Sequence, residues 1–122
     1  MRWIVIAWLV FITGLSIAPL AVKTQLGTTG PYHDVGHLLV FFIATILLCS
    51  LARGVISRFI RYLGACCFGV LLEWLETAIY HDGMEWRDVM IHVVGATIGL
   101  AVVSVLTVIR SGFKKSEVSP EA

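Results

Sequence analysis

The chain has 122 residues, of which 58% are hydrophobic and 14% are charged, and its mean hydropathy is +0.91. Soluble globular domains carry about 25% charged residues, so this composition excludes an ordinary water-soluble fold. A formal net charge of +1 without a basic stripe argues against nucleic acid as a partner. The expected surroundings are a lipid bilayer.

Four apolar stretches occupy most of the chain, at residues 3–22, 35–52, 62–80 and 89–109. About 20 helical residues cross a hydrocarbon core roughly 30 Å thick, so each stretch is long enough to span it. Unpaired backbone groups are costly in lipid, and short loops make neighbouring helices antiparallel. The predicted fold class is therefore all-α, a four-helix transmembrane bundle formed by a single domain over residues 1–110.

The first stretch has some features of a secretory signal, since Arg2 precedes the apolar run and the small residues Ala18 and Ala21 lie near its end. The apolar run is too long for a signal, and Pro19 directly follows the best small-residue site. We therefore expect an uncleaved anchor.

Basic residues divide unevenly between the two sides of this bundle. Basic residues in short loops stay cytoplasmic. Of the nine, Lys23 and Arg87 fall on one side, and seven fall on the other: Arg2, Arg53, Arg58, Arg61, Arg110, Lys114 and Lys115. This split predicts that both termini are cytoplasmic and that the polar layer described next faces outward.

Two cytoplasmic segments follow from this orientation. Residues 111–122 are expected to form a polar, disordered tail. The basic segment 53–61 is interpreted as an inner loop that sets the topology and rests on anionic lipid, in preference to a dedicated ligand site.

Seven ionisable residues gather near the outer ends of three predicted spans. Six of them occur as pairs three or four residues apart, so each pair shares one helix face, and the seventh, Asp34, directly follows His33. The predicted pocket residues are His33, Asp34, His37, Glu73, Glu76, Asp88 and His92. Three helices are thus expected to direct two polar groups each at one pocket.

These residues also have plainer interpretations. Asp34 and Asp88 begin helices, where a carboxylate caps free N–H groups and complements the helix dipole. His33 is also compatible with a simple interfacial position. Glu73 is the deepest acid, and intramembrane acids usually face a bundle interior or a water-filled cavity. The catalytic candidates are accordingly Glu73, His37 and Asp88, with Glu76 and His92 next.

Small residues repeat at four-residue spacing on two spans. Gly95 and Gly99 continue the face of Asp88 and His92, and Ala65 with Gly69 repeats the pattern on the third span. Such residues let helices approach closely, so they predict packing contacts.

The polar motifs resemble those of the VanZ-like family of bacterial membrane proteins. That family has a pattern close to D-K-x-x-H-F, then E-x-x-Q, then R and D-x-x-x-N-x-x-G-x-x-x-G. The corresponding stretches here are H-D-V-G-H-L at 33–38, E-W-L-E at 73–76 and D-V-M-I-H-V-V-G-A-T-I-G at 88–99. The chain departs from the pattern where Glu76 replaces the amide, His92 replaces the asparagine, and Asp82 stands near the usual arginine. With these departures, the chain resembles a divergent member of the VanZ-like family.

The resemblance implies a multi-pass protein of the bacterial cytoplasmic membrane. We expect it to bind or modify a lipid-linked or glycopeptide-related envelope component through the polar pocket. Two alternatives stay open, a structural or assembly subunit of a membrane complex and a metal-assisted membrane hydrolase or transferase. The sequence assigns no metal and no cofactor, because the three cysteines match no metal-ligand spacing. It leaves enzymatic activity and oligomeric state open.

Overall fold

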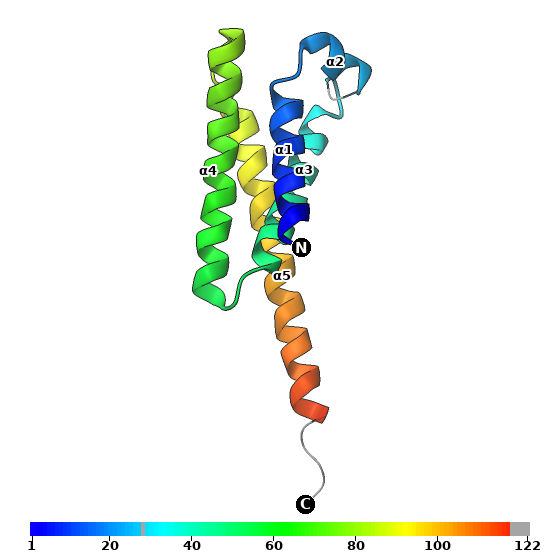
Figure 1. Cartoon of the computed structure of the whole chain (residues 1–122), viewed down its shortest axis with the longest axis vertical. Helices are drawn as coiled ribbons and strands as arrows, with labels where there is room; N and C mark the ends of the chain where they lie inside the picture. The colour runs from blue at the N-terminus through cyan, green and yellow to red at the C-terminus, as the bar shows by residue number, and fades with distance from the viewer. Residues whose placement is uncertain (28, 118–122) are drawn as a thin grey trace, which may run out of the picture.

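The computed structural model describes residues 1–27 and 29–117, and these residues form helices joined by short connections. The helices are α1 (Arg2–Ser16), α2 (Leu20–Gln25), α3 (His33–Ser50), α4 (Val55–Tyr80) and α5 (Trp86–Glu117). Helices α3, α4 and α5 pack against one another, and α1 packs against α3 and α4. Figure 1 shows these four helices running side by side, with the short α2 at one end of the bundle.

Three of the helices are long and apolar enough to cross a membrane. They are α3, α4 and the portion Trp86–Phe113 of α5, with 18, 26 and 28 residues. The short loops between them reverse the chain direction, so α4 runs antiparallel to its neighbours (Figure 1). This is the organisation of a multi-pass membrane protein.

The first predicted span, 3–22, is not one continuous helix. Helix α1 ends at Ser16, and its 15 residues rise about 22 Å, less than the roughly 30 Å of a hydrocarbon core. The break precedes Pro19, which has no N–H to donate and disfavours helical geometry in the residue before it. The hydroxyl of Tyr80 lies within hydrogen-bond distance of the carbonyl oxygens of Ile17 and Ala18, at 2.9 and 2.7 Å. A side chain of α4 therefore donates to the backbone carbonyl oxygens at the break.

Two other predicted boundaries were also wrong. The predicted inner loop 53–61 is mostly helical, because α4 begins at Val55, directly after Gly54 with its φ of 109°. The predicted disordered tail is helical from 111 to Glu117, where no proline interrupts the helix after its last apolar turn. The remainder of that tail lies outside the described residues. The end of α5 protrudes beyond the rest of the bundle (Figure 1).

Helices α3 and α5 approach closely at two glycines. A Cβ atom built on Gly95 would overlap the carbonyl oxygen of Leu38, and one on Gly99 would lie 2.8 Å from that of Phe42. Neither position has room for a side chain, so the small-residue spacing on α5 serves close packing against α3. This contact holds the first turns of both helices, which carry the polar residues, next to each other.

Candidate functional site

A cavity of about 350 Å³ lies between α1 and the α3–α4–α5 core, near the end of the bundle where α4 ends and α5 begins. Its polar and ionisable lining comes from five segments: Ser16, Lys23, Tyr32, His33, His37, Glu73, Glu76 and His92. Its apolar wall includes Ile12, Leu15, Val35, Leu39, Val40, Phe41 and Leu72. The cavity therefore offers a charged region and a hydrocarbon-like region side by side.

His92 lines the polar region of the cavity and is only 2% exposed. Its ring stacks on that of Phe41, with centroids 4.0 Å apart. A Cβ atom on Gly69 would lie 3.1 Å from both the Cβ and Nδ1 of His92, so this glycine provides the space that the imidazole occupies. The small-residue pattern on α4 thus accommodates a site residue as well as helix packing.

His37 joins His92 across the interface between α3 and α5. Nδ1 of His37 lies 2.5 Å from Nε2 of His92, and the two rings are nearly parallel. In a neutral pair, one nitrogen donates its proton to the other. Among the described residues, the second nitrogen of His92, Nδ1, is buried without a hydrogen-bond partner.

Glu73 completes this centre from α4, with 6% of its surface exposed. One ligand-type atom each of His37, Glu73 and His92 lies within 4.8 Å of the other two. Buried acids next to imidazoles can exchange protons or hold a cation. Three helices therefore meet in a compact acid–base cluster at the cavity wall.

A second polar group lines the same cavity, and in it residues of α1 and α2 contact Glu76 of α4. The ammonium group of Lys23 pairs with Oε1 of Glu76, and the hydroxyl of Ser16 donates to Oε2 at 3.2 Å. The positive charge beside Glu76 offsets the repulsion expected between this carboxylate and Glu73. The Lys23–Glu76 pair also connects the segment after the α1 break to α4.

Asp34 and Asp88 lie beside the cavity and do not line it. Asp34 pairs with the exposed Arg87, which ties the first turn of α3 to that of α5. Asp88 is 5% exposed, and its Oδ2 lies 3.9 Å from Nδ1 of His33. Both acids occupy first helical turns, where they complement the helix dipole, while the N-cap of α3 is Tyr32.

The structure brings five of the seven predicted pocket residues to the cavity wall and leaves those two aspartates behind it. Sequence reasoning missed Ser16, which lies within the first apolar stretch near its break, and Lys23, which directly follows that stretch. A lysine directly after an apolar run looks like a loop residue. Only the turn at Pro19 directs it back over the bundle.

In the part of the chain that the structure describes, two clusters have the composition of a metal site, His37 with Glu73 and His92, and His33 with His37 and Asp88. Both sets share His37. Nitrogen and carboxylate ligands of this kind suit zinc and related divalent metals.

Comparison of the chain with models of known protein families, with curated proteins and with solved structures found no match. The VanZ-like resemblance rests on the sequence motifs at 33–38, 73–76 and 88–99, and stays a prediction.

Proposed function

We propose that this protein is a small VanZ-like membrane protein that binds the polar headgroup of a lipid-linked envelope component in the cavity. The observation that carries the proposal is the composition of the cavity wall. Charged and imidazole groups lie beside an apolar surface formed by residues such as Leu15 and Val40. A ligand with a polar head and a hydrocarbon tail matches both parts.

The distribution of basic residues supports an outward-facing site. Arg53, Arg58 and Arg61 lie at the opposite end of the bundle from Lys23 and Arg87. By the positive-inside rule the end with more arginines is cytoplasmic. The cavity then lies at the outer face of the bacterial cytoplasmic membrane, where envelope precursors are exposed.

The cluster chemistry suggests how a headgroup would be held. The ammonium group of Lys23 pairs with the carboxylate of Glu76. An anionic group of a ligand that displaces Glu76 would form an ion pair with Lys23 in its place. Glu73 would accept hydrogen bonds from ligand hydroxyl or amine groups. His37 would exchange a proton with Glu73 if the bound group is also modified.

The test uses the full chain purified in a mild detergent from its native membrane, with retained lipids identified by native mass spectrometry. The wild-type protein is expected to retain a specific headgroup-bearing lipid. Glu73→Gln should lose this lipid while its folded yield stays nearly unchanged, because the amide keeps the shape and loses the charge. Glu85→Gln makes the same chemical change on an exposed loop and should retain it. Equal retention by both variants would contradict a role of Glu73 in binding.

A metal-assisted hydrolase or transferase is the second candidate, favoured by the spacing of His37, Glu73 and His92. Catalytic zinc commonly has three protein ligands and one water, which it activates for attack. Coordination would require the two ring nitrogens, now 2.5 Å apart, to separate to about 3.3 Å around a tetrahedral ion. Because this change breaks the histidine hydrogen bond, we rank the metal site below headgroup binding.

Zinc alone is the probe for this second candidate. Elemental analysis after equilibration with zinc chloride should give about one ion per chain if the cluster is a metal site. His92→Ala should then remove the ion, and His81→Ala, at an exposed residue, should keep it. Zinc content below one-tenth of an ion per wild-type chain would eliminate the candidate.

A further inference from the structure

A second hollow, of about 710 Å³, lies at the opposite end of the bundle from the histidine cluster. Its polar side chains come from three separate segments: Arg2 at the start of α1, Arg53 in the α3–α4 loop, and Ser57 and Arg61 in α4. Arg2 is more than fifty residues away from the others in the sequence. The hollow is therefore a product of the fold and extends beyond the basic segment 53–61.

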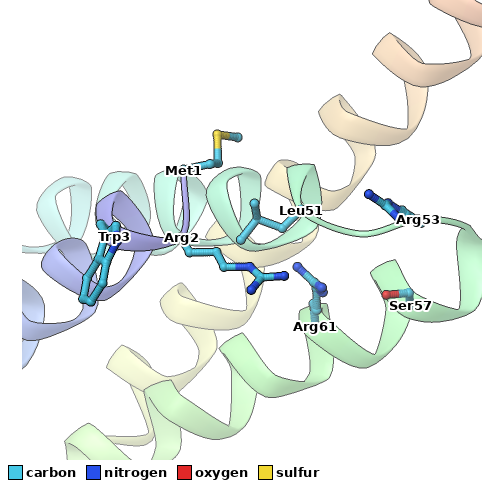
Figure 2. A pocket seen from close by; sticks show the side chains of 7 residues that line it. All are labelled: Met1, Arg2, Trp3, Leu51, Arg53, Ser57 and Arg61. Carbon is cyan, nitrogen blue, oxygen red and sulfur yellow. The ribbon is translucent and has the colours of Figure 1, made fainter.

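Two guanidinium groups face each other in this hollow. Figure 2 shows the side chains of Arg2 and Arg61 pointing toward one another from α1 and α4, with Arg53 at the rim. Among the side chains of residues 1–27 and 29–113, none of the three arginines takes part in an ion pair with a carboxylate. Like charges that converge in this way leave an excess of hydrogen-bond donors suited to an anion.

The orientation of Arg61 is held by the backbone. Its Nη1 donates to the carbonyl oxygen of Leu48 at 3.0 Å, in the last turn of α3. A guanidinium has five N–H donors in a planar fork, so this bond fixes the group and leaves other donors for a ligand. An arginine held in this way binds a phosphate with less loss of side-chain entropy.

The start of α4 adds further positive potential. This 26-residue helix begins beside the hollow after Gly54, which provides no side-chain cap for the first N–H groups. The partial positive charge of a helix N-terminus favours anions. Ser57, in the first turn, supplies a hydroxyl to the same hollow. The arginines thus act together with the helix dipole.

Apolar side chains beside the hollow indicate which anion fits. Trp3, which lines it, is 81% exposed, and Val55 and Ile56 at the start of α4 are 79% and 78% exposed. A free phosphate ion in water would gain nothing from this surface. The acyl chains of a membrane lipid would cover it while the phosphate reaches the arginines.

We propose that the hollow between Arg2, Arg53 and Arg61 is a binding site for the phosphate of an anionic phospholipid headgroup. This site is separate from the histidine cluster and does not depend on the function proposed for it. Basic pockets between transmembrane helices at the cytoplasmic side have the chemistry to bind such headgroups. A lipid held here would connect the start of α1 to α4, which otherwise pack against each other sparingly.

The experiment measures lipid binding by the full chain with phosphatidylglycerol and phosphatidylcholine in native mass spectrometry. The wild-type protein should retain one phosphatidylglycerol in preference to phosphatidylcholine. Arg2→Gln and Arg61→Gln should each lower its affinity for phosphatidylglycerol about fivefold. Arg110→Gln removes the same charge from an exposed position on α5 outside the hollow, and should leave the affinity within twofold.

Arg61→Gln also loses the bond to α3, so Arg2→Gln keeps the test valid if the former variant fails to fold. Equal weakening by Arg110→Gln and Arg2→Gln would overturn the proposal in favour of diffuse attraction to negative charge. Millimolar inorganic phosphate should not displace the lipid. Displacement by phosphate, or phosphate binding without lipid, would overturn the lipid assignment and indicate a site for a free anion.

Discussion

Nδ1 of His37 lies 2.5 Å from Nε2 of His92, and this contact joins α3 to α5 through two partly or fully buried imidazoles. Each ring supplies the hydrogen-bond partner of the other. The pair stands on one side of the cavity with Glu73 next to it. Removal of either ring therefore leaves a nitrogen of the other ring without this hydrogen-bond partner.

Removal of either histidine should destabilise the bundle, and removal of both should destabilise it less than the sum. His37→Phe leaves a buried nitrogen of His92 unpaired, at an expected loss of about 1–3 kcal/mol in unfolding free energy. A double-mutant cycle with His92→Phe, followed by thermal unfolding in detergent, measures the coupling. His81→Phe is the control, because His81 is exposed at the end of α4. Strict additivity would show that the two rings do not interact.

Gly95→Ala should destabilise the bundle strongly for so small a change. The new Cβ would overlap the Leu38 carbonyl oxygen, so α3 and α5 must separate, at an expected loss of about 1–3 kcal/mol. Gly64→Ala is the matched control, since nothing lies within 4 Å of a Cβ atom there, and alanine is the better helix former. Unfolding temperatures of the two variants should move in opposite directions. An unchanged Gly95→Ala protein would mean that the two helices lie further apart than described.

Tyr80→Phe should loosen the connection between α1 and α2. The change removes the only side-chain donor that the described residues offer to the carbonyl oxygens of Ile17 and Ala18. Hydrogen exchange around residues 17–23 should therefore rise, with a loss of about 1 kcal/mol in stability. Tyr62→Phe is the control, because the Tyr62 hydroxyl bonds to the side chains of Cys66 and Thr97, and Thr97 also donates to its own helix backbone. Equal exchange in both variants would show that the Tyr80 hydroxyl does not hold the connection between α1 and α2.

The orientation of the bundle is open to labelling with single cysteines. In a background without the three native cysteines, Gly83→Cys should react with an impermeant thiol reagent in intact spheroplasts. Gly112→Cys, near the other end of α5, should react only after lysis. The reverse pattern would place the cavity at the cytoplasmic face and the arginine hollow outside.

Hydropathy alone was sufficient to predict an all-helical membrane protein, because apolar length is a property of local sequence. The local sequence did not predict where α1 and α5 end. The break before Pro19 required a partner for its carbonyl oxygens, and Tyr80 supplies it from the far end of α4. The extension of α5 to Glu117 shows that a polar composition does not by itself end a helix.

The pairing of polar residues on helix faces could be read from their spacing, since residues three or four apart share a face. Which faces meet was decided by packing. The two glycines of α5 bring it against α3, and this contact sets His92 beside His37. Asp88, one turn earlier, is consequently held behind the cavity next to His33.

The sequence predicted that the polar faces of three helices meet, but it did not predict the contacts of Lys23 and Arg2, because helical periodicity specifies positions around one helix and carries no information on its neighbours. Lys23 reaches Glu76 only because the chain turns back at Pro19, and Arg2 faces Arg61 only because α1 packs against α4. Local sequence was sufficient to predict an all-helical chain, three apolar helices long enough to cross a membrane and the residues available for chemistry. The tertiary structure decided which of those residues meet, since burial in a packed bundle selects partners by shape and charge across helices.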